Sequence, residues 1–311
     1  MPLRIATRGS ALALWQAGRV RGRLLGELGL GADIVLVKTS GDRFNQASVG
    51  ALGLKGVFIK ELEEALVESR AELAVHSMKD VPTAIDSRFA FPAVLRRDDV
   101  RDCLLSRSGA AFDQLPPGAR VGTSSLRRRA LLRHRRPDLE VADLRGNVDT
   151  RLAKLDRGDY DAIVVAKAGL DRLGLAERIT QVLPCELVLP AVGQGALGIE
   201  TRAADSDLNR LLAELEDPET RAAIDAERAL LAELEGGCQV PVGAWARREN
   251  GRLVMDACVA SVDPGASEGE FIRLSADAST GEEPEKLGRV LARRLLDAGA
   301  DRILRLTGRN R

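Results

Sequence analysis

The chain has 311 residues, of which 45% are apolar and 30% are charged, and its formal net charge is zero. This length exceeds one comfortable hydrophobic core, so we expect two or three globular domains, and the neutral balance excludes a strong steering field around the whole molecule. No apolar run approaches the ~20 residues that cross a membrane, and the first residues lack the apolar region and cleavage site of a signal peptide.

The first hundred residues alternate strand and helix patterns, as βαβ units do. They predict strands at residues 3–6, 34–37, 72–75 and 89–95, and helices at 11–28 and 58–69. Ser10 has the side chain of an N-cap for the first of these helices. Residues 39–56 are polar and lack periodicity, which predicts a mobile loop of the kind that forms lids. Residues 96–99 are interpreted as a crossing to a second domain.

A second α/β pattern begins near residue 101. It predicts strands at 120–122, 140–144 and 160–165, and helices at 126–136, 148–155 and 168–173. Because strands and helices alternate, we expect a parallel sheet. Residues 187–190 and 193–196 are interpreted as the return crossing.

The pattern changes in the last third of the chain. Helices at 205–215 and 218–235 are followed by strand-like runs at 243–247, 253–259 and 271–276, then by a helix at 285–298 and a last run at 302–306. Strands in succession, flanked by helices, predict a small α+β domain with an antiparallel sheet.

A polar stretch leaves the predicted strand at 72–75. His76, Ser77, Lys79 and Asp80 place a base, a hydroxyl, an ammonium and a carboxylate within five residues. Open α/β sheets bind ligands at such strand ends, and so polar a cluster is costly to bury without partners. A solvated turn with a salt bridge explains the same residues, so the stretch alone leaves both interpretations open.

Arginine is concentrated in residues 120–151, where nine Arg face four acids. Three hydroxyl residues open a helix there, and its first turn carries Arg127 and Arg128. Helix-start N–H groups and guanidinium forks suit a carboxylate ligand. An ordinary capped, solvent-facing helix is the alternative. Nucleic-acid phosphate is disfavoured, because no aromatic residue for base stacking accompanies this basic stripe.

Other cationic residues stand at strand ends or helix starts. Arg8, Arg145 and Arg151 occupy such positions in two domains, so a cleft between the domains could hold several carboxylates at once. Phosphate is the competing ligand, but the chain has no GxxxxGK[ST] or GxGxxG motif. Lys55 and Phe58, at the end of the predicted loop, could close such a cleft or simply start a helix.

Four widely spaced cysteines without a CxxC pair, together with only two histidines, predict reduced thiols in a cytoplasm and no metal site. Cys238 differs from the others because it follows Gly-Gly, which leaves its thiol sterically open, and a thiolate is a good covalent nucleophile. Its alternative is the usual one for a lone cysteine, a small buried hydrophobe.

Five blocks of the chain closely resemble the porphobilinogen deaminase family, also called hydroxymethylbilane synthase. They are residues 74–82 (AVHSMKDVP), 121–128 (VGTSSLRR), 144–148 (LRGNV), 189–196 (LPAVGQGA) and 236–241 (GGCQVP). The resemblance begins at residues 4–8 and covers about three quarters of the chain. After Val242 it rests mainly on the pattern of elements.

The resemblance implies an α/β fold in which two domains like those of periplasmic binding proteins surround a cleft. A small C-terminal α+β domain with an antiparallel sheet completes the expected architecture. The implied domains span residues 1–96 with 196–215, residues 101–190, and residues 218–311. We further expect a monomeric cytoplasmic enzyme that binds neither nucleic acid nor membrane.

By the same resemblance, Cys238 carries a dipyrromethane cofactor through a thioether. Four porphobilinogen units are added to it, and linear hydroxymethylbilane is released for porphyrin and haem biosynthesis. Asp80 is the implied catalytic carboxylate. The residues implied to contact the cofactor are Lys79, Asp80, Thr123, Ser124, Ser125, Arg127, Arg128 and Arg145. Those implied to contact the substrate are Arg8, Ser10, Gln16, Lys55, Phe58, Ser77, Arg145, Arg151, Arg172 and Gln194.

The chain departs from the family pattern at four positions. Ala51 and Leu54 lie in the predicted loop, Asp149 stands where glycine is expected, and Lys167 where a small or apolar residue is usual. A non-catalytic, two-lobed binding protein for a polycarboxylate or oxyanion is the alternative function, since it shares the architecture but needs neither Asp80 nor a reactive cysteine.

Overall fold

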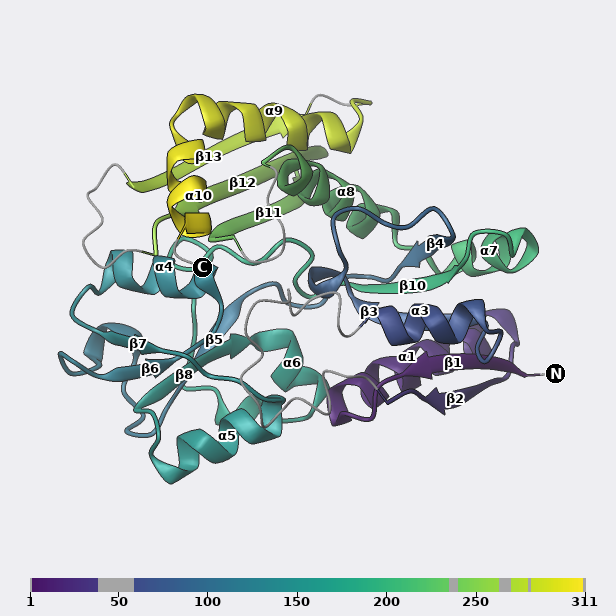
Figure 1. Cartoon of the computed structure of the whole chain (residues 1–311), viewed down its shortest axis with the longest axis horizontal. Coiled ribbons are helices and arrows are strands. Elements are labelled where there is room, and N and C mark those ends of the chain that lie inside the picture. The colour runs from purple at the N-terminus through teal and green to yellow at the C-terminus, as the bar shows by residue number, and fades with distance from the viewer. Residues whose placement is uncertain (1, 39–58, 235–239, 263–269, 279–280, 310–311) are drawn as a thin grey trace. The chain divides into compact units, whose positions relative to one another are not determined.

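The computed structural model describes residues 2–38, 59–234, 240–262, 270–278 and 281–309 (Figure 1). The predicted mobile loop, with Lys55 and Phe58, and the predicted cofactor anchor Cys238 lie outside the described residues. The chain forms two compact units, one made of Met1–Asp98 with Gly195–Arg221 and the other of Asp99–Gln194 with Ala222–Arg311. The three-domain boundaries, which divide the second unit once more, stay a prediction.

The first unit is built on a five-stranded sheet in the order β2-β1-β3-β10-β4. Its strands are β1 (Leu3–Thr7), β2 (Ala32–Leu36), β3 (Leu73–Ser77), β4 (Phe89–Val94) and β10 (Leu197–Arg202). The sequence pattern missed β10, which runs antiparallel to both of its neighbours, so the sheet is mixed. The strand was missed because it contains Glu200 and Thr201. Both are buried in the fold, but polar residues in a sequence usually indicate an exposed segment.

Helices cover both faces of this sheet. They are α1 (Ala11–Leu28), α3 (Lys60–Val67) and α7 (Ser206–Leu212). Ile5 packs with α1 whereas the next residue, Ala6, packs with α3, and successive strand residues point to opposite faces. Ser10 caps α1 as predicted, since its Oγ accepts a hydrogen bond from the Ala13 N–H. The two predicted helices at 58–69 and 205–215 are shorter in the structure.

The second unit contains another five-stranded sheet, in the order β7-β6-β8-β5-β9. Its strands are β5 (Asp102–Ser106), β6 (Arg120–Gly122), β7 (Glu140–Ala142), β8 (Ala162–Ala166) and β9 (Gln181–Val182). The helices α4 (Leu126–Arg135), α5 (Val148–Arg157) and α6 (Lys167–Arg172) accompany it. The three predicted strands β6, β7 and β8 pair in parallel, as expected. The sheet as a whole is mixed, because β5 pairs antiparallel with β8 and β9. The sequence pattern missed β5 and β9.

The C-terminal part of the second unit holds an antiparallel sheet in the order β11-β12-β13, as predicted. Its elements are α8 (Pro218–Glu233), of which the residues from Ala222 on belong to this unit, β11 (Val242–Glu249), β12 (Arg252–Ala260), β13 (Phe271–Ala278), α9 (Pro284–Asp297) and α10 (Ala300–Arg309). The run at 302–306 is therefore helical. Leu230 of α8, Met255 of β12 and Leu291 of α9 share one buried core, which confirms the expected class of two α/β sheets plus a small α+β part.

Helices α8 and α9 approach each other closely at Gly288. A Cβ added there would lie 2.1 Å from the Ala226 carbonyl oxygen and 2.9 Å from the Leu230 nitrogen, both of which are backbone atoms. We expect Gly288→Ala to lower the free energy of unfolding by about 1–3 kcal/mol, measured by urea denaturation. Gly26→Ala in α1 is the matched control. A Cβ added at Gly26 has open space around it, and this variant should raise the free energy of unfolding by up to about 1 kcal/mol. Equal losses of stability in both variants would contradict the close approach at Gly288.

Candidate active site

Asp80 lies on a turn at the end of β3. The chain leaves the sheet through the 3-10 turn Met78–Asp80, which is held where the Met78 N–H donates to the Ala196 carbonyl at 3.0 Å. Met78 is buried beneath the turn and Asp80 is exposed. Among the residues that the structure describes, none hydrogen-bonds or ion-pairs with the Asp80 carboxylate. The turn thus presents a carboxylate from a rigid strand end.

His76 does not share this exposed turn, although the sequence pattern grouped it with Asp80. The residue is 5% exposed, and its Nε2 lies 2.8 Å from the Glu200 Oε2 of the neighbouring strand β10. Glu200 is itself 1% exposed, and a buried carboxylate requires such a partner. The pair belongs to the interior of the sheet.

Several other predicted residues of the first unit gather at the same edge of its sheet. β1 and β3 are parallel neighbours, so their carboxyl ends meet there, with Arg8 following β1 and Ser77 closing β3. Gln16 of α1 is 6% exposed, and its Nε2 donates to the Ser77 Oγ at 2.9 Å. The structure therefore brings these predicted residues to the strand ends that carry Asp80, where open α/β sheets bind ligands.

The predicted hydroxyl residues of the second unit have local backbone partners. Ser125 caps α4 by accepting from the Arg128 N–H, and the Thr123 Oγ1 accepts from the Ser125 N–H at 3.3 Å. The Ser124 Oγ hydrogen-bonds both the carbonyl and the N–H of Leu144 at 3.0 Å. The contacts of Ser124 hold the start of α4 against the segment after β7. That these three hydroxyl residues contact cofactor or substrate stays a prediction.

Arg127 and Arg128 are buried and share one carboxylate, so the solvent-facing alternative is wrong for these two side chains, although His134 and Arg135 of the same helix are exposed. Their side chains are 4% and 7% exposed, and their Nη2 atoms lie 2.8 Å and 2.7 Å from the two oxygens of Asp102, which is 0% exposed. The Arg127 Nη1 donates to the Leu189 carbonyl at 2.6 Å, and the Arg128 Nη1 to the Val164 carbonyl at 3.1 Å. The forks expected to bind ligand carboxylates therefore have an internal partner.

Asp102 was missed by the sequence reasoning. Burial by itself would raise its pKa, but the charges of Arg127 and Arg128 and hydrogen bonds from Arg128 and Gln194 outweigh burial, so the pKa lies well below the usual carboxyl range. Gln194, a predicted site residue, is 1% exposed and donates its Nε2 to Asp102 at 2.8 Å and to the Val100 carbonyl at 2.7 Å. The only sequence signal for Asp102 is its place directly before the apolar run 103–105.

The remaining predicted arginines of the second unit differ in exposure. Arg145 is exposed, Arg151 is half-buried, with its Nε donating to the Gly146 carbonyl at 2.8 Å, and Arg172 is buried at the end of α6. Gly146 has a φ of +116°, a conformation that favours glycine. Lys167, one of the departures, pairs with Asp171 of its own helix at 2.5 Å. Its ammonium also lies 3.8 Å from a carboxylate oxygen of Asp99, so two carboxylates of the second unit engage its charge.

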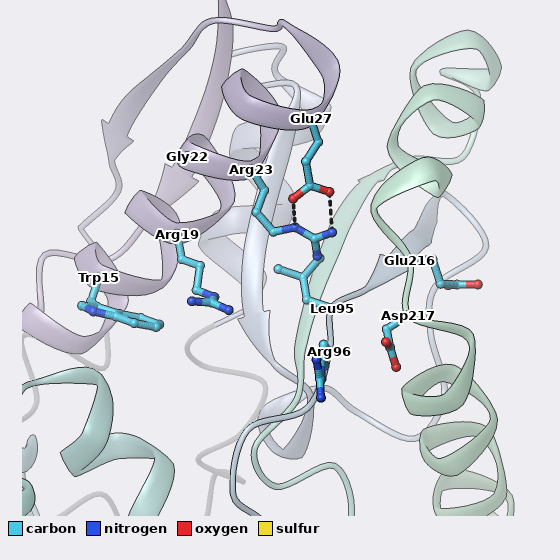
Figure 2. A pocket seen from close by; sticks show the side chains of 9 residues that line it. All are labelled: Trp15, Arg19, Gly22, Arg23, Glu27, Leu95, Arg96, Glu216 and Asp217. Atoms are coloured by element: carbon cyan, nitrogen blue, oxygen red, sulfur yellow. Dashed lines mark hydrogen bonds and ion pairs between the residues drawn. The ribbon is translucent and has the colours of Figure 1, made fainter. Parts of the chain in front are cut away.

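A cavity of about 650 Å³ lies in the first unit but contains none of the predicted site residues. Figure 2 shows Arg23 and Glu27 one turn apart on α1, with each carboxylate oxygen of Glu27 lying 2.6 Å from a nitrogen of the Arg23 guanidinium. Trp15 and Arg19 of the same helix and Leu95 also line it. None of the residues that line this cavity was predicted from the sequence to be catalytic or to bind a ligand.

The three described cysteines are free and buried, namely Cys103, Cys185 and Cys258. Burial raises the pKa of Cys103 to about 12 and the pKa values of Cys185 and Cys258 to about 11, which makes them poor nucleophiles. Within the described part of the chain, no group of three or more metal-binding side chains occurs, and no helix is long and apolar enough to cross a bilayer.

Comparison with known proteins identifies the family to which this chain belongs. Residues 3–210 match the family model described as porphobilinogen deaminase, dipyromethane cofactor binding domain, and residues 222–297 match that of the porphobilinogen deaminase C-terminal domain. The chain belongs to the porphobilinogen deaminase family. It is accordingly an enzyme, a deaminating transferase of tetrapyrrole biosynthesis that uses a dipyrromethane cofactor, and not the non-catalytic binding protein.

Curated relatives named porphobilinogen deaminase match nearly the whole chain. Those of Syntrophobacter fumaroxidans, Syntrophotalea carbinolica and Stenotrophomonas maltophilia are 46%, 48% and 50% identical over 97% of this chain and 96%, 95% and 98% of their own lengths. Among solved structures, the periplasmic VFT2 domain of Bordetella pertussis BvgS is 19% identical, with a TM-score of 0.42, over 68% of this chain and 86% of that chain.

Proposed function

We propose that Asp80 is the catalytic carboxylate of this porphobilinogen deaminase and that Cys238 holds the dipyrromethane cofactor. Four porphobilinogen units are added to it and hydroxymethylbilane is released. The observation that carries the proposal is the exposed Asp80 carboxylate on a rigid strand-end turn, inside the block that matches the family motif. Sites on rigid elements hold a charged group where the reaction needs it.

The residues of the second unit fit a polycarboxylate. Each pyrrole of the cofactor carries an acetate and a propionate, so two pyrroles bring four carboxylates. Arg127 and Arg128 share the single carboxylate of Asp102, which leaves one positive charge in excess in this buried cluster. The Nε atoms of both arginines are buried and find no hydrogen-bond acceptor among the described residues. A ligand carboxylate would supply both the missing charge and the missing acceptor.

Asp80 would act on the charge that develops during each addition. Loss of ammonia from porphobilinogen leaves an electron-poor cation, and an adjacent carboxylate stabilises it and hydrogen-bonds the pyrrole N–H groups. The dipyrromethane cofactor, when bound, would supply a free α-carbon as the nucleophile. Asp80 would take part in removing the proton that this carbon must lose. Ser77 and Lys79, on the same strand end, would orient the reacting substrate.

The other predicted contacts complete this assignment. Arg8, Arg145, Arg151 and Arg172 would bind the acetate and propionate side chains, because a guanidinium fork matches a carboxylate bidentately. Lys55 and Phe58 are proposed to lie near the substrate entrance. We also propose that the enzyme works as a monomer in the cytoplasm and binds no nucleic acid.

The mass of the intact purified protein tests the proposal. Wild-type protein is expected to carry a covalent increment consistent with two pyrrole units, and Cys238→Ala should lack it. Cys185→Ala, which removes a buried thiol, is the control and should retain the increment. A fully active wild-type enzyme without any adduct would overturn the assignment of the cofactor to Cys238.

A further inference from the structure

The buried cluster around Asp102 engages all four Nη atoms of its two arginines. Both Nη atoms of Arg127 and of Arg128 donate to Asp102 or to backbone carbonyls. The two Nε–H groups have no acceptor among the described residues, and each Nη carries a second N–H as well. Among the described residues, Asp102 is the one side chain that hydrogen-bonds both guanidinium groups.

The charge of the cluster also depends on Asp102. Two guanidinium groups, both at least nine-tenths buried, carry two positive charges in adjacent positions of α4, and the Asp102 carboxylate offsets one of them. Without that carboxylate the two groups would repel each other in surroundings that screen charge poorly. Gln194 donates to the same carboxylate and so fixes its position as well.

We propose that Asp102 is a positioning residue for cofactor assembly. It holds Arg127 and Arg128 with their Nε–H groups and the surplus positive charge directed at a carboxylate of the dipyrromethane cofactor. This inference rests on the proposed function, since it assigns how two of the proposed cofactor-binding arginines are aligned. Asp102 itself does not touch the reacting atoms.

An opposite role for Asp102 makes the opposite prediction. If its carboxylate merely competed with the ligand for the two forks, its removal would free them and strengthen cofactor binding. If it positions the forks, its removal weakens binding, because the arginines lose the arrangement in which both meet one ligand carboxylate. The fraction of protein that carries the covalent adduct separates these roles.

The experiment measures that fraction by intact mass in purified, folded protein. Asp102→Asn keeps the shape of the side chain and removes its charge, and it should lower the adduct-bearing fraction at least about tenfold. Two controls come from the same helix or its partners. Asp143→Asn breaks the surface pair with Arg129, and Leu132→Ala leaves a cavity in the α4 core. Both should remain loaded as wild type does.

The outcomes separate the two proposals. Wild-type loading or higher in Asp102→Asn would overturn the positioning role, as would an equal loss in Leu132→Ala at a similar melting temperature, because destabilisation alone would then explain it. A wild-type protein that lacks the adduct would overturn the proposed function instead.

A milder variant serves if Asp102→Asn does not fold. Gln194→Met removes the hydrogen bond to Asp102, together with one to the Val100 carbonyl, and leaves every charge in place. It should reduce loading about three- to tenfold, in keeping with the loss of one hydrogen bond to a charged group. Unchanged loading in Gln194→Met would contradict the inference.

Discussion

Asp80→Asn is expected to lower kcat by a factor of about 10² or more, while the free energy of unfolding stays within about 0.5 kcal/mol of wild type. The asparagine amide has nearly the shape of the carboxylate but cannot stabilise a cation or take a proton. Asp80 is exposed on its turn, and no partner among the described residues depends on its charge. We therefore expect a large loss of kcat without a loss of stability.

Single-turnover kinetics on adduct-bearing protein, together with urea denaturation, provide the check. Asp86→Asn is the matched control, because Asp86 is also an exposed carboxylate a few residues further on, where it pairs with Arg88. It should retain wild-type kcat. Wild-type turnover in Asp80→Asn would reject the catalytic role, and an equal loss in both variants would point to a general charge effect.

Asp102→Asn is expected to lower the free energy of unfolding at pH 7 by about 3–5 kcal/mol, because it leaves two buried guanidinium groups without their shared counter-charge. Asp102 is 0% exposed and bonds to Arg127, Arg128 and Gln194. Asp143→Asn removes a pair at the surface and should cost at most about 1 kcal/mol. Urea denaturation at pH 7 measures both losses, and a loss below that of Asp143→Asn would contradict the buried ion cluster.

The pH dependence of this loss has a definite sign. The pKa of Asp102 is lower in the folded chain than in the unfolded chain, because the charges of the two arginines outweigh the effect of burial. Its stabilisation is therefore complete above the ordinary carboxyl pKa of about 3.9 and declines as the pH falls below that value. The difference in unfolding free energy between wild type and Asp102→Asn should shrink between pH 4 and pH 2. A difference that grows over this range would contradict the assignment.

Local chemistry made several elements predictable from the sequence. The bounds of α1 and its cap Ser10 agree with the prediction, because an N-cap and a 3.6-residue apolar period involve only neighbours along the chain. The antiparallel strands of the C-terminal part follow from short apolar runs with turn residues between them. The motif around Asp80 and the Gly-Gly-Cys segment were visible as residue patterns, and the roles of both stay predictions.

Only the tertiary structure revealed the elements that depend on distant partners. The strands β5 and β10 escaped prediction because each contains a buried carboxylate, Asp102 or Glu200, that looks like a surface residue until its partner is known. That partner lies far along the chain, on α4 for Asp102 and at His76 for Glu200. The sequence determined which residue types are available and where helices begin. The fold decided which charges are buried together, because burial without a partner is too costly and the partner is found only when distant segments meet.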